Sequence, residues 1–255
     1  MTTVAVIQAR TGSTRFPGKV LADLCGRPML AHVIERVSLA RTVDRVVVAT
    51  TEEAEDDAVA ALAGQCRVAV TRGPVDDVLS RFVLAATQQA ADVVVRITAD
   101  CPLVDPAVVD QVVEARALQG ADYASNVEPA TYPDGYDVEV FTVACLERLD
   151  HEAVLPHERE HVTARVREHP DEFRAVRVAW DRDLSSIRLT VDVPEDLERV
   201  AAVLAALPKA PPPNVAAVVA YLAGRPDLGR GQGLPERDER YRAQRDAARP
   251  QESSG

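Results

Sequence analysis

A basic, glycine-containing stretch near the amino terminus has the residue types that hold phosphate groups. Residues 8–19 read QARTGSTRFPGK and carry Arg10, Arg15 and Lys19 with no acidic residue among them. Glycines let backbone N–H groups approach oxygen atoms closely, and the cations supply the opposite charge. Lys19 is one of only two lysines in a chain that uses arginine elsewhere, which indicates a need for a compact charge. The alternative is a polar turn with surface arginines.

The spacing within this stretch differs from two well-known phosphate-binding patterns. Gly12 and Gly18 are separated by five residues where the Walker loop has four. Val20 follows Lys19 where that loop has Ser or Thr. The stretch also lacks a G-x-G-x-x-G run, since Gly-x-Gly occurs only at 229–233. We therefore expect a phosphate site of another type.

Two aspartates follow β-strand patterns in distant parts of the chain. Asp100 comes after the Val/Ile-rich run 92–98, and Asp192 ends the run 187–192. Ligands of open parallel sheets bind at the carboxyl ends of the strands, so both side chains are expected near the basic loop. Carboxylate oxygens, with phosphate and water, are what Mg²⁺ prefers. The alternative for each aspartate is a helix cap.

Residues 157–161 match the zinc-protease pattern H-E-x-x-H. One extended form of that pattern needs glycine at 164 and histidine at 167, where the chain has Ala164 and Arg167. A glutamate as third ligand stays open, because acidic residues are plentiful downstream. Short matches also arise by chance in helices rich in His and Glu, so we favour another role for this segment.

The composition limits the class of protein. The chain has 255 residues and a net charge of −11, which disfavours a nucleic-acid polymer as partner. No early apolar run reaches the roughly 20 residues of a membrane span, and no signal peptide is seen. The cysteines lie dozens of residues apart, so neither a zinc site nor disulfides are expected: Cys25, Cys66, Cys101 and Cys145. We expect a cytoplasmic protein.

The hydrophobic pattern alternates short β-branched runs with helical stretches over the first 120 residues. Strands are predicted at 4–9, 45–51, 67–71 and 92–98, and helices from Pro28 and at 53–63, 75–89 and 105–118. This rhythm predicts an α/β fold with a mostly parallel sheet and helices on both faces.

The pattern changes after residue 120. Short strands are predicted at 122–126, 137–142, 173–180 and 187–192, with helices at 155–168, 194–206 and 214–223. A mixed sheet is expected here. We expect a single domain over 1–223, and residues 224–255 to form a flexible charged tail because they contain few large apolar residues.

Six stretches occurring in order resemble the cytidylyltransferase family, which includes CMP-sugar synthetases and enzymes of the spore-coat-polysaccharide type. They are IQARTGSTRFPGKVL, RGPVDDVLSRF, RITADCPLVDP, YPDGYDVEVF, REHVT and LTVDVPEDLE. The resemblance covers about residues 3–206. It implies a Rossmann-like nucleotide-diphospho-sugar transferase fold. It also implies attack of an acceptor on the α-phosphate of CTP, with Mg²⁺ as cofactor and loss of pyrophosphate.

The resemblance also implies roles for individual residues. The triphosphate group comprises Ala9, Arg10, Gly12, Ser13, Arg15 and Lys19, and the nucleoside group Arg72, Asp77 and Arg81. The acceptor group comprises Asp134, Asp137, Glu139, Arg159 and His161, and the metal ligands are Asp100 and Asp192. Lys19, Arg10 and Asp100 would be catalytic. Glu139 reads equally well as a structural carboxylate, and Arg159 and His161 as solvent-facing helix residues.

The acceptor is the least defined part of this reading. The resemblance suggests a 3-deoxy or nonulosonic acid sugar, bound within a subregion at about 120–190 that also serves dimerisation where members form homodimers. A small phosphonate is the alternative acceptor. The arginines at 72, 81, 96, 159 and 188 suit either anion. An alternative of another class is a nucleotide-binding protein without turnover.

Overall fold

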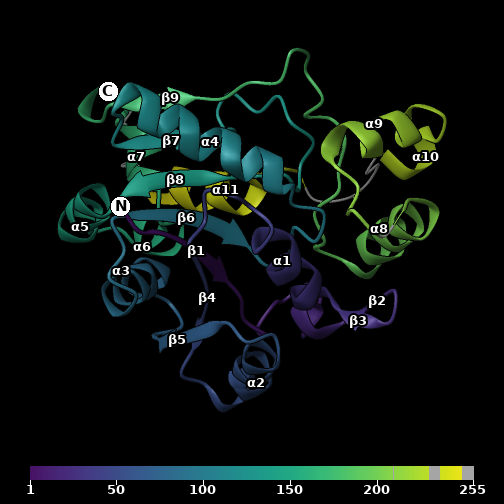
Figure 1. The fold of residues 1–255 in the computed structure, drawn as a ribbon. Coiled ribbons are helices and arrows are strands. Elements are labelled where there is room, and N and C mark those ends of the chain that lie inside the picture. Colours follow the sequence, from purple (N-terminus) through teal and green to yellow (C-terminus); the bar gives the residue numbers. More distant parts are fainter. Residues whose placement is uncertain (209, 230–235, 249–255) are drawn as a thin grey trace, which may run out of the picture.

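The computed structural model describes residues 1–208, 210–229 and 236–248, and its centre is a seven-stranded sheet (Figure 1). The strand order is β5-β4-β1-β6-β8-β7-β9. The strands are β1 Thr3–Gln8, β4 Arg45–Thr51, β5 Ala69–Gly73, β6 Val93–Thr98, β7 Tyr123–Ser125, β8 Glu139–Thr142 and β9 Ala175–Arg177. A small separate hairpin pairs β2 Asp23–Leu24 with β3 Arg27–Pro28.

Strands β5, β4, β1 and β6 are parallel, so their carboxyl ends lie at one edge of the sheet. Strand β8 runs antiparallel to β6 and to β7, while β9 is parallel to β7. The predicted fold class is therefore confirmed: an α/β fold with a mostly parallel, mixed sheet flanked by helices. The edge formed by the ends of β1 and β6 is where Gln8 and Thr98 pair in register.

Helices cover both faces of the sheet (Figure 1). The α-helices are α1 Met29–Val37, α2 Asp57–Gln65, α3 Val78–Gln88, α4 Pro106–Gln119, α5 Val143–Glu152, α6 Pro156–Glu160, α7 Ala164–Glu168, α8 Pro194–Ala206, α9 Val215–Ala223, α10 Pro226–Gly229 and α11 Glu239–Ala248. Single 3₁₀ turns occur at η1 Lys19–Leu21, η2 Ala54–Asp56 and η3 Pro170–Glu172. Helix α4 starts as predicted, because Asp105 accepts a hydrogen bond from Ala107 N ahead of Pro106.

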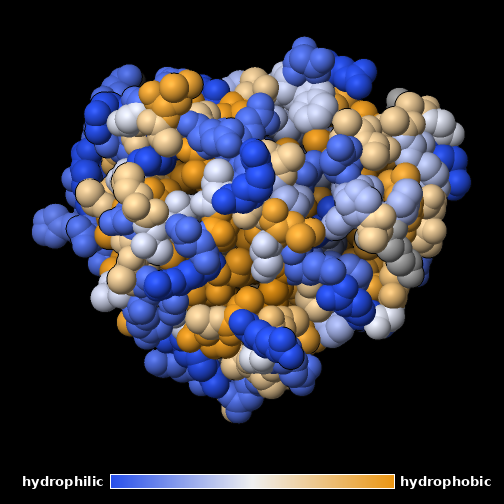
Figure 2. Space-filling view, in the orientation of Figure 1, coloured by the Kyte–Doolittle hydropathy of each residue, from blue (hydrophilic) through white to orange (hydrophobic). Residues whose placement is uncertain are grey.

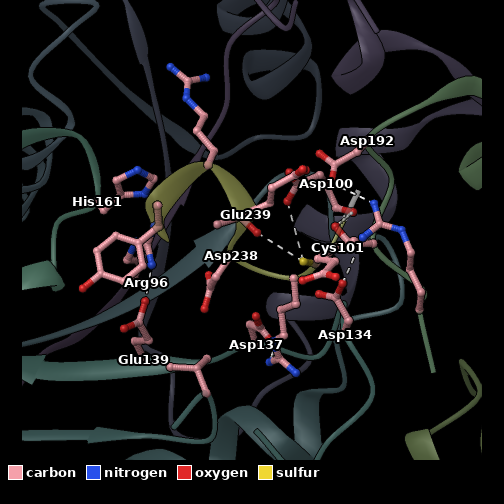
Figure 3. Close-up of a pocket in the computed structure, with 18 of the residues that line it drawn as sticks. Arg96, Asp100, Cys101, Asp134, Asp137, Glu139, His161, Asp192, Asp238 and Glu239 are labelled. Atoms are coloured by element: carbon pink, nitrogen blue, oxygen red, sulfur yellow. Dashed lines mark hydrogen bonds and ion pairs between the residues drawn. The ribbon is translucent and has the colours of Figure 1, made fainter. Parts of the chain in front are cut away.

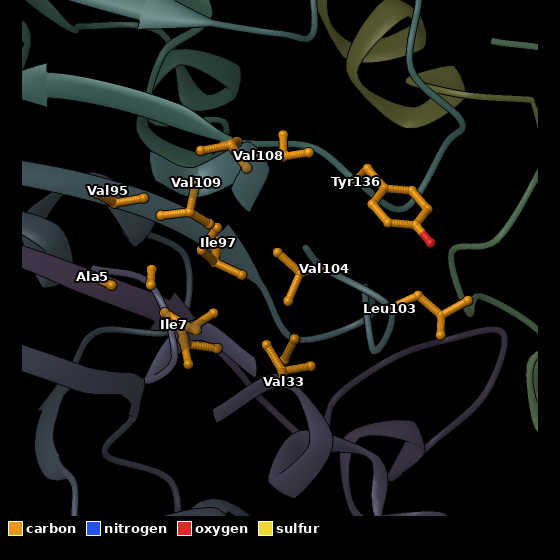
Figure 4. Close-up of a cluster of buried hydrophobic side chains, with 14 of the residues drawn as sticks. Ala5, Ile7, Val33, Val95, Ile97, Leu103, Val104, Val108, Val109 and Tyr136 are labelled. Carbon is orange, nitrogen blue, oxygen red and sulfur yellow. The ribbon is translucent and has the colours of Figure 1, made fainter. Parts of the chain in front are cut away.

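Two apolar layers sandwich the sheet because strand side chains alternate between its faces. In β1, Ala5 and Ile7 pack in the layer that contains α1 and α4, whereas Val4 and Val6 pack against α3 and α5. Figure 4 shows the first layer, where Ile7 and Ile97 lie near Val33 of α1. This core fixes the strands whose ends carry polar residues.

The structure corrects three secondary-structure predictions. Residues 187–192 form no strand but a single bridge between Asp134 and Arg188, because Leu189 N bonds to Asp134 O and Val191 N to Asp100 O. The predicted helix 155–168 is split into α6 and α7 at Val162, whose φ of 35° is left-handed. The strand predicted at 173–180 is limited to β9.

Two helices lie within the predicted tail from residue 224, whose flexibility stays a prediction. These helices are α10 and α11; α10 packs on α9, and α11 contacts α6. Residues 230–235 and 249–255 lie outside the described residues.

The polarity of the surface, the state of the cysteines and the lengths of the helices are three features that the composition addressed. Figure 2 shows hydrophilic side chains over much of the visible face, with apolar ones gathered in a hollowed area near its centre. All four cysteines are free thiols. Within the described residues, no helix combines the length and apolar character that crossing a membrane requires.

Candidate functional site

The basic loop directly follows β1 and folds back on itself before η1. Ser13 N and Gly18 N both donate to Thr11 O, at 2.7 and 2.9 Å. Gly18 has φ 71°, a left-handed conformation that glycine adopts without steric cost, and it brings the chain into η1. The first residue of η1 is Lys19, so the turn directs this side chain back toward the sheet edge.

Asp56, a buried residue that sequence reasoning missed, anchors the loop from the next βα unit. Its Oδ1 accepts hydrogen bonds from Thr11 N at 2.7 Å and Thr11 Oγ1 at 2.8 Å. Its Oδ2 accepts from Thr51 Oγ1. Burial alone would raise the pKa of Asp56, but these hydrogen bonds lower it, so the residue stays a carboxylate. Asp56 is the last residue of η2 and directly precedes α2, so in the sequence it resembles only a helix-start signal.

Lys19, Asp100 and Asp192 converge as the sequence predicted. Lys19 Nζ lies 2.9 Å from Asp100 Oδ2 and 3.0 Å from Asp192 Oδ1, and it donates to Val191 O at 2.8 Å. Asp100 and Asp192, which lie 81 and 173 positions after Lys19 in the sequence, thus share its ammonium group. The Lys19 side chain is only 10% exposed, so the ion pairs are shielded from water.

This arrangement of charges shifts the pKa values of Lys19 and Asp192. Burial acts to lower the pKa of Lys19, but Asp100 and Asp192 outweigh it and raise the pKa above its ordinary value. Burial acts to raise the pKa of Asp192, but Lys19, Arg188 and Arg15 lower it to about 2. The lysine is therefore a permanent cation, and Asp192 a permanent anion, near neutral pH.

Asp196, which is fully buried, holds Asp192 in place. It accepts hydrogen bonds from Asp192 N at 2.9 Å and Val193 N at 3.2 Å, and from the guanidinium of Arg188. Arg188 Nη2 in turn donates to Asp192 Oδ2 at 2.8 Å. The signal available in sequence was an acidic residue in the first turn after Pro194, a helix-start pattern. Such a pattern predicts a cap, not support for a functional carboxylate.

A larger cavity of about 640 Å³ lies over the loop and the ends of β1 and β6. Among its lining residues are Ala9, Arg10, Gly12, Ser13, Arg15, Lys19 and Arg81, all of which the sequence assigned to the nucleotide. Its volume lies within the range of small-molecule sites. Arg81 is 2% exposed, its Nε and Nη1 have no hydrogen-bond partner among the described residues, and burial lowers its pKa to about 10. An anion at this place would satisfy it.

A smaller cavity of about 180 Å³ adjoins the first and shares Asp100, Asp192 and His161 with it (Figure 3). Asp134, Asp137 and Glu139, the predicted acceptor residues, line it. Burial, together with neighbouring carboxylates, raises the pKa of Asp134 to about 6 and that of Asp137 to about 7. These shifts mark a crowded polar pocket rather than an inert surface.

The turn at Gly135 holds Asp134 and Asp137 against the 187–192 segment. Gly135 has φ 109°, and a Cβ atom there would meet the backbone of Leu189 at 2.7 Å. Only glycine fits this close approach. Asp134 then pairs with Arg188 at 3.2 Å.

Three predicted residues lie elsewhere. Arg72 donates to Thr51 O at 2.7 Å and pairs with Asp57, and it lines neither cavity. Asp77 caps α3 through Ser80 N and pairs with Arg159 at 2.6 Å. Arg72, Asp77 and Arg159 thus all take part in ion pairs and line neither cavity, and their contact with nucleotide or acceptor stays a prediction.

Glu139 combines cavity lining with a structural role. It is 3% exposed, accepts hydrogen bonds from Tyr123 OH at 2.6 Å and Thr163 Oγ1 at 2.5 Å, and pairs with Arg96. These contacts hold its pKa below the ordinary value despite burial. The structural reading of Glu139 therefore accounts for all of these contacts.

The zinc-protease reading of residues 157–161 is wrong. His157 Nε2 contacts Glu168 at 3.0 Å, whereas His161 Nε2 contacts Gln244 at 2.6 Å. Helix α6 ends at Glu160, so the two histidines do not share one continuous helix face. In the part of the chain that the structure describes, no three His, Cys, Asp or Glu side chains are grouped to hold a metal.

Asp100 and Asp192 suit Mg²⁺ because this ion needs few protein ligands when substrate phosphate and water complete its coordination. Both present carboxylate oxygens to the two cavities, and Mg²⁺ commonly binds through one or two carboxylates plus substrate phosphates and water. Two converging carboxylates beside a phosphate-type loop provide this donor set. The residues therefore fit the metal that the sequence predicted.

Sequence reasoning also missed the wall supplied by the C-terminal segment, which we define as Glu236–Ala248. Arg237 pairs with Asp137 of the smaller cavity, and Arg240 pairs with Glu160 at 2.7 Å. Gln244 bridges His161 and Glu160. A charged run after a proline-rich spacer carries no signal for such docking.

Comparison with known proteins identifies the family. A family model described as Cytidylyltransferase matches residues 4–211. The spore coat polysaccharide biosynthesis protein SpsF of Bacillus subtilis is 31% identical, over 87% of this chain and 94% of its own. A 3-deoxy-manno-octulosonate cytidylyltransferase of Anaeromyxobacter dehalogenans is 33% identical, over 79% and 97%.

A solved structure agrees with this assignment. A cytidylyltransferase from Leptospira borgpetersenii superposes with a TM-score of 0.87 at 33% identity, and the match covers 92% of this chain and 100% of the other. The family model spans the basic loop, both aspartates and the turn at Gly135. The chain thus belongs to the cytidylyltransferase family, a group of nucleotidyltransferases that use CTP.

Proposed function

We propose that this chain transfers CMP from CTP to a small anionic acceptor of the 3-deoxy or nonulosonic acid sugar type, with Mg²⁺ as cofactor and release of pyrophosphate. The observation that carries the proposal is the convergence of Lys19, Asp100 and Asp192 where the two cavities meet. The name of the Anaeromyxobacter dehalogenans relative, which specifies 3-deoxy-manno-octulosonate, supports the acceptor class.

The larger cavity is the proposed CTP site. The loop after β1 offers backbone N–H groups, and Arg10, Arg15 and Lys19 offer positive charge to the triphosphate. The buried, partly unpartnered guanidinium of Arg81 lies in the same cavity and suits a further anionic or carbonyl oxygen of the nucleotide. The acceptor then occupies the smaller cavity, on the other side of Asp100 and Asp192.

The proposed reaction is an in-line displacement at the α-phosphorus of CTP. An acceptor oxygen forms the new P–O bond, the bond to the β-phosphate oxygen breaks, and its electron pair leaves with pyrophosphate while the acceptor proton passes to water. Lys19 stabilises the charge that develops on the transferred group and leaving group. When bound by Asp100 and Asp192, Mg²⁺ supplies further positive charge to the same oxygens.

A pyrophosphate-release assay tests this function. CTP is compared with ATP, GTP and UTP in the presence of 3-deoxy-manno-octulosonate, nonulosonic acids and simple phosphonates, with and without Mg²⁺. We expect release with CTP and a sugar acid and none after chelation of Mg²⁺. Release with another nucleotide in preference to CTP would contradict the assignment of the base.

One observation favours the phosphonate alternative. The smaller cavity, at about 180 Å³, lies below the common size range of ligand sites. A small phosphonate needs less room than a sugar acid. Turnover with phosphonates alone in the same assay would establish this alternative. CTP binding without pyrophosphate release from any acceptor would instead indicate a nucleotide-binding protein without turnover.

A further inference from the structure

The carboxylate of Asp238, from the C-terminal segment, lies inside the smaller cavity as a built-in anion (Figure 3). Its Oδ2 accepts a hydrogen bond from Arg167 Nη2 at 2.6 Å. Arg96 and Arg237 line the same cavity. Arg167 was not among the residues implied by sequence. The cavity thus already holds a carboxylate among three arginines.

The three arginines favour negative charge at this point. Burial acts to raise the pKa of Asp238, but Arg167, Arg237 and Arg96 together hold it below the ordinary value. Arg167 is held in place by Glu128 at 3.3 Å and lies over the ring of Tyr241 at 4.4 Å. Among the described residues, the Nε of Arg237 is buried without a hydrogen-bond partner. The guanidinium of Arg167 donates to two carboxylates, those of Glu128 and Asp238, so this position already binds acidic oxygens.

Two cations of the cavity, Arg167 and Arg15, are engaged by carboxylates of the C-terminal segment. Asp238 holds Arg167, and Glu239 holds Arg15 at 3.6 Å. An acidic acceptor needs such cations, because a buried anion without a partner is strongly disfavoured. The acceptor must therefore displace these internal carboxylates.

The C-terminal segment is attached by contacts that are readily exchanged. Tyr241 is the only residue of α11 that is buried. The other contacts are polar, and include Gln244 with His161, and Arg240 with Glu160. Segments with few buried apolar contacts open locally at low free-energy cost. The segment also lies beyond residues 4–211, which match the family model.

We propose that Arg167, with Arg96, binds the acidic group of the acceptor, and that Asp238 occupies this site until the acceptor displaces it. The ligand class is a carboxylate or phosphonate borne by the acceptor. This proposal rests on the proposed function, since it assigns a part of the acceptor site. It makes the C-terminal segment a competitor that raises the acceptor concentration needed for turnover.

The test is Asp238→Asn in the full-length chain. Asparagine tolerates the left-handed φ of 58° at this position, so the backbone is retained while the charge is lost. We expect the KM for the acceptor to fall about tenfold, because the competent state becomes the main one. The KM for CTP stays within about twofold, since Asp238 does not line the larger cavity.

Asp246→Asn is the matched control. Asp246 lies on the same helix, is 59% exposed and pairs with Arg245, so its loss leaves both cavities intact. Its KM values are expected to equal those of the wild type. An acceptor KM that is unchanged or raised in Asp238→Asn would overturn the proposal, because Asp238 would then be neutral or would itself bind the acceptor.

A second measurement needs no turnover. Amide hydrogen exchange of residues 236–248 is followed while methylphosphonate is titrated. We expect faster exchange in the wild type and no response in Arg167→Gln. A wild-type segment that ignores methylphosphonate contradicts the site. A response without pyrophosphate release from any acceptor leaves the anion site standing and removes the proposed function, so the two failures are distinguishable.

Discussion

The larger cavity takes much of its wall from one continuous run of chain, whereas the smaller cavity is assembled from distant segments. Residues 8–10, 12–15, 19 and 20 contribute most of the phosphate-type wall of the first. The second combines the turn at Gly135, the 187–192 segment and the C-terminal segment. Backbone hydrogen bonds shape the loop of the first cavity, and ion pairs across more than 50 residues join the parts of the second.

This difference separates a preformed half of the site from an adjustable one. The loop after β1 is held by strand register, by the turn at Gly18 and by Asp56. The arginines that line the smaller cavity have carboxylate partners from several segments. A triphosphate can bind to groups already in place, while an acidic acceptor must exchange ion pairs. The following substitutions test that contrast.

Removing the ammonium group that joins the halves has the largest expected effect. Lys19→Ala is expected to lower the rate of pyrophosphate release by about 10²–10³, since one preorganised charge donor at the reacting group is lost. Steady-state kinetics measure the effect, and a thermal melt reports folding. Arg41→Ala, on an exposed side chain, is the control. A folded Lys19→Ala protein with normal turnover contradicts the role of Lys19.

Asp100→Asn comes next, with an expected loss of about 10² in rate and a higher Mg²⁺ requirement. The amide keeps the shape of the side chain but removes the charge that the metal and Lys19 use. Asp92→Asn is a matched control, because Asp92 precedes the opposite end of β6 and its carboxylate contacts the amino terminus, far from both cavities. Near-normal turnover of Asp100→Asn over a Mg²⁺ titration would remove the metal assignment.

Asp56→Asn probes the preformed half alone. Loss of the charge weakens the hydrogen bonds to Thr11, and we expect the KM for CTP to rise about tenfold. The KM for the acceptor is expected to change less than twofold, as Asp56 lines neither cavity. Equal increases in both KM values would show that the two halves are not separable.

Asp134→Asn probes the other half through pH and has the smallest expected effect. Burial raises the pKa of Asp134 to about 6, so its stabilising protonated form is present below the unfolded-state pKa of about 4 and is lost as pH rises through 6. The melting temperature of the variant, relative to wild type, should therefore gain about 5 °C between pH 4 and pH 8. A relative change of opposite sign would contradict the raised pKa.

The sequence alone predicted the elements that rest on local patterns. Short, nearly continuous β-branched runs between helical stretches predicted β1, β4 and β6, because a strand buried on both faces has such a sequence. The basic loop and the two aspartates could be placed at one sheet edge, since parallel strands end together. The meeting of Lys19 with Asp100 and Asp192 follows from that topology.

Only the tertiary structure decided which charges meet outside those strands. Arginine and carboxylate pairing depends on position in space, and the chain offers many combinations of the two. For that reason Arg159 was expected at the acceptor but pairs with Asp77, while Arg167 was overlooked and lies beside Asp238. The C-terminal segment lacks an apolar pattern, so its docking through ion pairs and Tyr241 left no periodic signal in the sequence.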